Sequence, residues 1–118
     1  PGYGYATLSK REQKKFGLMM EDYLINRKNL KHVFMLVDFR NKPSNDDMQM
    51  YKFLKYYKVP VTIVATKVDK VAITHQQKQR SVILNNLDLV VGDDFLMFSN
   101  VTKQGRDEVY EKIERIIS

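Results

Sequence analysis

A short polar loop near the middle of the chain carries groups that could recognise a nucleotide base. Thr66, Lys67, Val68 and Asp69 directly follow a run of β-branched and small residues at 61–65. The Asp69 carboxylate has two acceptor oxygens, and guanine offers two adjacent donors, its ring N–H and its exocyclic amine. Adenine has an acceptor at that ring position, so a buried carboxylate would face an unpaired lone pair, at a cost of about 1–3 kcal/mol or more. The loop therefore favours guanine.

The other residues of this loop suit supporting tasks. The methylene stem of Lys67 can cover the face of a base while its ammonium group stays in water. The hydroxyl of Thr66 can tie the loop to a neighbouring loop. The pattern (N/T)-K-x-D at the end of a strand is the guanine-reading motif of GTP-binding proteins. The alternative interpretation is an ordinary Lys-x-Asp turn after a strand.

A second polar loop begins about 30 residues later, at Phe98, Ser99 and Asn100. A small polar residue at this place lets backbone amides approach the carbonyl oxygen of guanine. The alternative is that Ser99 only joins a strand to a turn. Asp38 and Arg40 follow another apolar run and are expected to brace the end of that strand, although they lie near the expected nucleotide.

The elements that must position these loops can be read from the spacing of apolar residues. Short apolar runs predict strands at 33–37, 61–65 and 95–98. Helical spacing predicts helices at about 9–26, after a turn at 43–47, at 76–86 and at 104–117. Ser9 and Glu12 have the spacing of a capping box, and Thr74 is placed to cap the third helix. Strands separated by helices imply an α/β fold with a parallel sheet, which binds ligands at the carboxyl ends of its strands.

Composition narrows the class of protein. The chain has 118 residues, enough for one domain with one core. It contains no apolar run of about 20 residues and no signal-peptide pattern, so we expect no membrane span and a cytoplasmic location. Cysteine is absent, and His32 and His75 lie far apart, so we expect neither disulfides nor a metal site.

Charge suggests a polyanionic partner. The net charge is +6 and the isoelectric point is about 9.5. Seven basic residues and three acidic ones fall between positions 10 and 31. Such a basic segment is a candidate surface for RNA, because arrays of Lys and Arg bind phosphates without sequence selectivity. The alternative is a solvated helix face.

Four segments together resemble one family. The segments are PGYGYA at 1–6, PSNDDMQMYKFL at 43–54, TKVDK at 66–70 and FSNVTKQG at 98–105. They resemble the EngB (YsxC) family of bacterial GTP-binding proteins. The resemblance implies a Ras-like P-loop GTPase fold, with a mostly parallel sheet and helices on both faces. It also implies a small translation-factor-class GTPase that acts as a switch in assembly of the large ribosomal subunit and is needed for normal cell division and septation.

The resemblance assigns a set of GTP- or GDP-binding residues. Thr66, Lys67, Val68 and Asp69 would form the base-recognition loop, and Phe98, Ser99 and Asn100 the second base loop. Pro1 and Gly2 would be the end of the D-x-x-G switch that contacts the γ-phosphate. Tyr3 stands where Ras-type enzymes place a water-orienting glutamine. The resemblance therefore implies slow intrinsic hydrolysis that a ribosomal partner would trigger. Ordinary hydrophobic packing is the alternative for Tyr3.

The chain also departs from the family. No G-x-x-x-x-G-K-(S/T) occurs, and the first switch is missing, so the groups that hold the phosphates and Mg²⁺ are not in this sequence. We therefore expect residues 1–118 to be the C-terminal part of one G domain, with three strands and about four helices. Alone it should be inactive, with no catalytic residues and no metal ligands. The complete protein is expected to be a monomer, whereas the open strand at 33–37 could associate with another copy.

Two other functions remain open from the sequence. One is a non-catalytic α/β module that binds a protein or RNA and uses no nucleotide. The other is a doubly wound domain with a different cofactor, although no G-x-G-x-x-G follows any strand here. Selectivity for guanine over adenine separates the GTP-binding interpretation from both.

Overall fold

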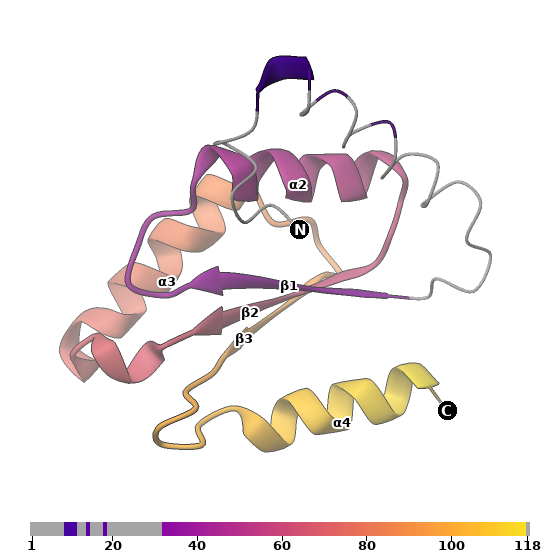
Figure 1. Ribbon diagram of the computed structural model, residues 1–118. Coiled ribbons are helices and arrows are strands. Elements are labelled where there is room, and N and C mark those ends of the chain that lie inside the picture. The colour runs from indigo at the N-terminus through magenta and orange to yellow at the C-terminus, as the bar shows by residue number, and fades with distance from the viewer. Residues whose placement is uncertain (1–8, 12–13, 15–17, 19–31, 118) are drawn as a thin grey trace.

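Three parallel strands form the centre of the structure (Figure 1). The computed structural model describes residues 9–11, 14, 18 and 32–117. Within this part, β1 covers Val33–Asp38, β2 covers Val61–Thr66 and β3 covers Asp94–Met97, in the order β1-β2-β3. All three strands are confirmed to within one residue at either end. The predicted first helix and its capping box, and the segment from Pro1 to Gly2, fall wholly or largely outside the described residues.

The strands are paired so that their carboxyl ends lie level. Val33 pairs with Val61, and the register continues to Asp38 opposite Thr66. On the other side of β2, Ala65 pairs with Met97. The polar segments that follow β1, β2 and β3 therefore leave the sheet at the same edge, as the sequence predicts for a parallel arrangement.

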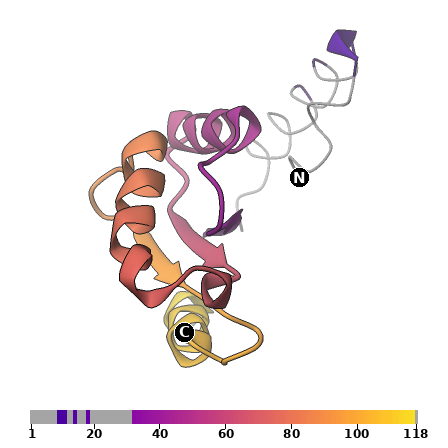
Figure 2. The ribbon, with the colours of Figure 1, turned by 90° about the vertical axis from the view of Figure 1, so that its left-hand side faces the viewer.

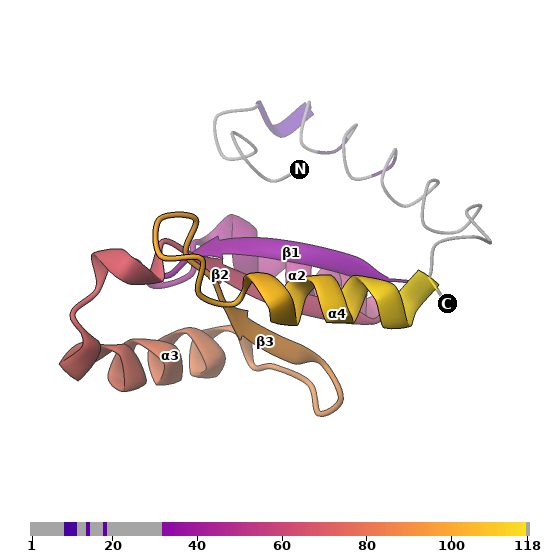
Figure 3. The ribbon, with the colours of Figure 1, turned by 90° about the horizontal axis from the view of Figure 1, so that it is seen from below.

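Helices cover both faces of the sheet (Figures 1, 2 and 3). Helices α2 (Asn45–Tyr56) and α3 (Ile73–Leu87) lie on one face, and α4 (Arg106–Ile117) lies on the other. The core lies under α2 and α3, where apolar side chains from the helices meet those of β1 and β2. Its central members are Met35, Val37, Tyr51, Leu54, Ile63, Ile83 and Leu87.

Local sequence explains how two of these helices begin. Ser44 caps α2: its Oγ accepts from the Asp47 backbone N–H at 3.1 Å, and the Asp47 carboxylate accepts from the Ser44 N–H at 3.1 Å. The prediction that Thr74 caps α3 is wrong, because the helix begins at Ile73 and Ala72 is its N-cap. Here the side chain of Gln76 instead turns back, and its Nε2 donates to the backbone oxygens of Val68 and Val71.

The face under α4 is less completely covered. Helix α4 has no fully buried residue. Helical spacing places Val109, Ile113, Ile116 and Ile117 on one apolar stripe, yet Ile117 is 71% exposed. On β1, Leu36 alternates with the buried Met35 and Val37 and is 49% exposed. The apolar stripe of α4 is therefore wider than the surface that three strands offer it.

A buried carboxylate ties the helices to the sheet at the end opposite the polar loops. Asp93, which directly precedes β3, accepts from Tyr51 Oη at 2.6 Å, Lys55 Nζ at 2.7 Å and the Val61 N–H at 3.2 Å. Tyr51 Oη in turn accepts from the Val90 N–H at 2.9 Å. Burial and the bond to Asp93 raise the pKa of Tyr51 to about 12, so its hydroxyl remains a donor at neutral pH.

We predict that this network makes stability depend on pH in the acid range. Burial alone would raise the pKa of Asp93, but the bonds from Lys55, Tyr51 and Val61 outweigh it and hold the pKa below its ordinary value of 3.8. A lowered carboxyl pKa gives stability that is present above about pH 4 and is lost as pH falls through the folded-state pKa. Asp93→Asn should lower the free energy of unfolding by about 1–3 kcal/mol at pH 7 and flatten its fall below pH 4.

Urea unfolding at several pH values between 7 and 2.5 measures both effects. Asp88→Asn is the matched control, because Asp88 is exposed and caps α3 in a left-handed conformation that asparagine also tolerates. If the free energy of unfolding of Asp93→Asn falls below pH 4 as steeply as that of the parent chain, the Asp93 carboxylate does not set the pH dependence of stability.

Candidate functional site

The two predicted base loops meet through one hydrogen bond. Ser99 Oγ donates to Asp69 Oδ1 at 2.7 Å, and the same Oγ accepts from the Thr102 N–H at 3.1 Å. Ser99 is fully buried, whereas the side chain of Asp69 is 13% exposed. The second oxygen of Asp69 has a more distant neighbour, Lys70, whose Nζ lies 3.9 Å from Oδ2. The bond from Ser99 thus fixes one oxygen of the carboxylate, while a small part of the Asp69 side chain remains exposed to solvent.

Backbone bonds hold the same two loops in register. The Phe98 N–H donates to the Ala65 oxygen at 2.8 Å, and the Val68 N–H donates to the Phe98 oxygen at 3.2 Å. The side chain of Val68 is fully buried, so the middle of the loop points into the core while its polar neighbours stay accessible. Asn100, the last residue of the predicted second loop, is exposed.

The first loop turns sharply after β2. Thr66 Oγ1 donates to the backbone oxygen of Val37 at 3.2 Å, which ties the loop to the end of β1. Lys67 has a left-handed backbone, with φ 63°, and a short 3-10 helix, η2 (Val68–Lys70), follows it. A residue with a side chain adopts positive φ at a cost of about 1–2 kcal/mol and keeps it only where its surroundings enforce it. The left-handed backbone of Lys67 is therefore enforced by the bonds that hold Thr66 and Val68 on either side of it.

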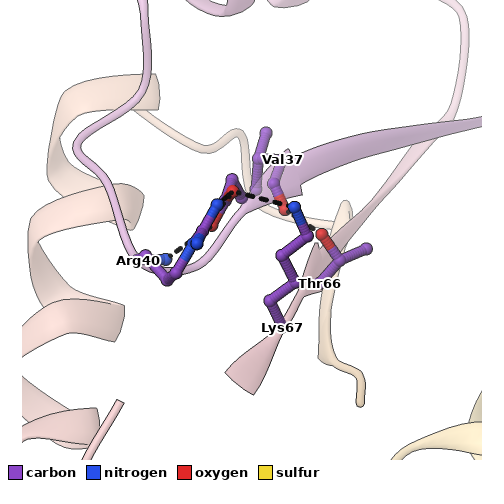
Figure 4. Close-up of polar contacts among 5 residues, drawn as sticks. Val37, Arg40, Thr66 and Lys67 are labelled. Carbon is purple, nitrogen blue, oxygen red and sulfur yellow. Dashed lines mark hydrogen bonds and ion pairs between the residues drawn. The ribbon is translucent and has the colours of Figure 1, made fainter. Parts of the chain in front are cut away.

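A charged cluster lies beside this turn (Figure 4). The Arg40 side chain forms a bidentate ion pair with the Asp38 carboxylate: its Nε donates to Oδ1 at 3.0 Å and its Nη2 donates to Oδ2 at 2.7 Å. This contact holds the pKa of Asp38 at about 2, so the carboxylate is charged at neutral pH. Lys67 Nζ lies 3.6 Å from Asp38 Oδ2. Asp38 and Arg40 pair with each other at the carboxyl end of β1, and their bracing of the strand end stays a prediction. The contact of Asp38 with Lys67 was not predicted from the sequence.

The predicted contacts with the γ-phosphate, Pro1 and Gly2, lie outside the described part of the chain. Within it, no group of three or more His, Cys, Asp or Glu side chains is placed to hold a metal ion. None of its helices is both long enough and apolar enough to cross a membrane.

Gly105 closes the turn behind Ser99, and sequence reasoning did not single it out. The backbone of this turn is compact: the Ser99 N–H donates to the Gln104 oxygen at 3.0 Å, and the Lys103 N–H donates to the Ser99 oxygen at 2.9 Å. Gly105 has φ +78°, and a Cβ at this position would lie 2.0 Å from the backbone oxygen of Met97. Only glycine fits, because both the backbone angle and the space exclude a side chain.

We predict that Gly105→Ala lowers the free energy of unfolding by more than about 2 kcal/mol, because strain and a backbone collision act together. Gly92→Ala is the matched control: Gly92 also has positive φ, at +101°, but an added Cβ meets nothing within 4 Å. It should lose only about 1 kcal/mol. Urea unfolding of both variants makes the comparison, and equal losses would show that the collision at Met97 is relieved.

The parallel sheet, with helices on both faces and polar loops at one edge, defines the class of protein as an α/β domain with a Ras-like fold. A solved structure of translation elongation factor SelB from Methanococcus maripaludis, in its apo form, superposes with a TM-score of 0.63 and 18% sequence identity. The superposition covers 72% of this chain and 19% of the SelB chain. At this identity the likeness shows the fold, and it confirms the predicted Ras-like fold class.

Sequence comparison identifies the family within that class. Over 113 residues the chain is 52% identical to proteins named "Probable GTP-binding protein EngB" from Streptococcus pneumoniae, strains Hungary19A-6 and TIGR4. The match covers 96% of this chain and 58% of each relative. The chain therefore corresponds to a region of EngB, which confirms the resemblance. No protein-family model matches the chain.

Proposed function

We propose that this chain is the guanine-reading part of a GTP-binding domain. The single observation that supports this most is the 2.7 Å bond by which buried Ser99 fixes the carboxylate of Asp69. Homology to proteins named as GTP-binding supports the same conclusion independently. The chain spans 58% of the length of those relatives, so the activity of a complete protein belongs to this proposal.

Asp69 would select guanine through its remaining acceptor positions. An ionised carboxylate has about four lone-pair positions on two oxygens, and the bond from Ser99 occupies one of them. To the others, the ring N–H and exocyclic amine of guanine would donate in parallel, since part of the Asp69 side chain is exposed to solvent. Because little water reaches this carboxylate, a base that offers an acceptor there would leave a charged group poorly paired.

The neighbouring residues would supply the remaining contacts with the base. Thr66 anchors the loop to β1 through its bond to the backbone oxygen of Val37. The stem of Lys67 would cover one face of the base. The backbone of Ser99 and Asn100 would receive the carbonyl oxygen of guanine. Phosphates and Mg²⁺ would be held by groups outside this chain, together with the switch to which Pro1 and Gly2 are assigned.

The finer functional assignments rest on the EngB resemblance. We propose a cytoplasmic bacterial switch protein that acts in assembly of the large ribosomal subunit and supports cell division and septation. The basic segment at 10–31 is the proposed surface for rRNA. GTP hydrolysis would require the complete domain, which we expect to be monomeric, and this chain alone would bind GTP more weakly than micromolar.

We predict a guanine preference that changes in a defined way when Asp69 is replaced. The backbone amides of 66–70 and 98–100 should shift when millimolar GMP is added to the ¹⁵N-labelled chain, and should respond much less to AMP. IMP should bind less well than GMP because it lacks the exocyclic amine. Asp69→Asn should lose about 5–150-fold in GMP affinity, equivalent to about 1–3 kcal/mol, and should gain affinity for XMP, because the asparagine amide donates where the carboxylate accepts.

Two controls accompany this NMR titration. Asp88→Asn makes the same chemical change at the far end of α3 and should leave the order of the nucleotides unchanged. Calorimetry with GDP and ADP on the protein that carries the rest of the domain repeats the comparison with phosphates bound. An equal response to GMP and AMP would falsify the assignment of Asp69 and favour a module that uses no nucleotide.

A further inference from the structure

The charged cluster of Asp38, Arg40 and Lys67 lies at the edge of the base site, and the base-reading contacts do not account for it (Figure 4). We propose that Asp38 is a positioning residue for Lys67: its carboxylate holds the ammonium group so that the methylene stem stands ready to cover a guanine base. This inference rests on the proposed function and adds a residue to that site.

Asp38 is held rigidly enough to serve as an anchor. Three donor groups of Arg40 bind it: the backbone N–H at 2.9 Å from Oδ1, Nε within 3.2 Å of both oxygens, and Nη2 at 2.7 Å from Oδ2. Because Arg40 is only two residues away, this grip is local and does not depend on distant packing. A bidentate guanidinium–carboxylate contact fixes direction as well as distance.

The backbone places Lys67 within reach of that anchor. Asp38 and Thr66 are directly paired across β1 and β2, and the Phe39 N–H donates to the Thr66 oxygen at 2.9 Å. The left-handed conformation of Lys67 follows at once, and Figure 4 shows its side chain reaching back to the end of β1. Both partners are thus attached to the same pair of strands.

The ion pair with Asp38 favours one position of the Lys67 side chain and still leaves that side chain accessible to a ligand. Lys67 Nζ lies 3.6 Å from Asp38 Oδ2, and the lysine side chain remains 55% exposed. A free lysine side chain loses rotamer entropy when it is immobilised. Holding it before the base arrives lowers that part of the cost of binding. The very low pKa of Asp38 supports the role, since the anchor keeps its charge.

A double-mutant cycle tests whether Asp38 acts through Lys67. Asp38→Asn, Lys67→Met and the double variant are titrated with GMP and AMP by NMR, beside the parent chain and Asp88→Asn. Asp38→Asn should weaken GMP binding about two- to five-fold, the range expected for an exposed ion pair of about 0.4–1 kcal/mol. It should have no effect when methionine replaces Lys67. The preference for GMP over AMP should survive, because Asp69 sets it.

The possible failures are distinguishable. If the parent chain shows no preference for GMP over AMP, the proposed function is wrong. If the parent prefers GMP but Asp38→Asn binds as well as the parent, or loses equally in both Lys67 backgrounds, Asp38 is only a brace for β1 and the positioning role is overturned.

A measurement on the unmutated chain covers the case in which Asp38→Asn does not fold. The ammonium protons of Lys67 should exchange with water more slowly than those of the exposed Lys42, because an ion pair shields them. Equal exchange rates for Lys67 and Lys42 would overturn the proposal.

Discussion

The hydrogen bond from Ser99 to Asp69 is the interaction on which the candidate site depends. It joins two loops that are 30 residues apart in the chain and fixes the orientation of a carboxylate that has little access to water. An unfixed aspartate could rotate about its side-chain bonds and present its oxygens in many directions. The buried serine removes that freedom before any ligand arrives, which is the general advantage of a preorganised polar group.

The sheet makes this bond possible. Because β2 and β3 run parallel and in register, the residues that follow them leave at the same edge, and the Phe98 N–H can bond to Ala65. The compact turn closed by Gly105 follows Ser99, whose hydroxyl bonds to Asp69. The proposed selectivity would therefore depend on strand pairing and on one glycine, as well as on the residues that would contact a base.

Much of the architecture could be predicted because it depends on local sequence. The strands follow from short apolar runs, and the start of α2 follows from Ser44 and Asp47, which are three residues apart. The start of α3 was misplaced because Thr74 has a suitable capping side chain, yet the helix begins one residue earlier, at Ile73. Val71 is extended after the short turn at Val68–Lys70, and Ala72 is the N-cap without a side-chain hydrogen bond.

Contacts between distant residues could not be read in this way. Tyr51 is fully buried, and its hydroxyl bonds to Asp93, 42 positions later, a contact that the spacing of residues in α2 does not indicate. The approach of Lys67 to Asp38 depends on the β1–β2 register and on a left-handed backbone, neither of which is visible in the residues alone. The proximity of the loops at Asp69 and Ser99 could be predicted because the (N/T)-K-x-D motif is associated with a second loop after the next strand.

The placement of Asp93 has a consequence for how this chain can change. It secures the amino-terminal ends of β2 and β3, whereas the base loops follow the carboxyl ends of the same strands, and a strand of six residues is about 20 Å long. Mutations at that distance without shared partners have nearly additive effects. Residues at the proposed base site can therefore change at one end while the other preserves the scaffold, so a descendant of this chain could lose that site and still fold.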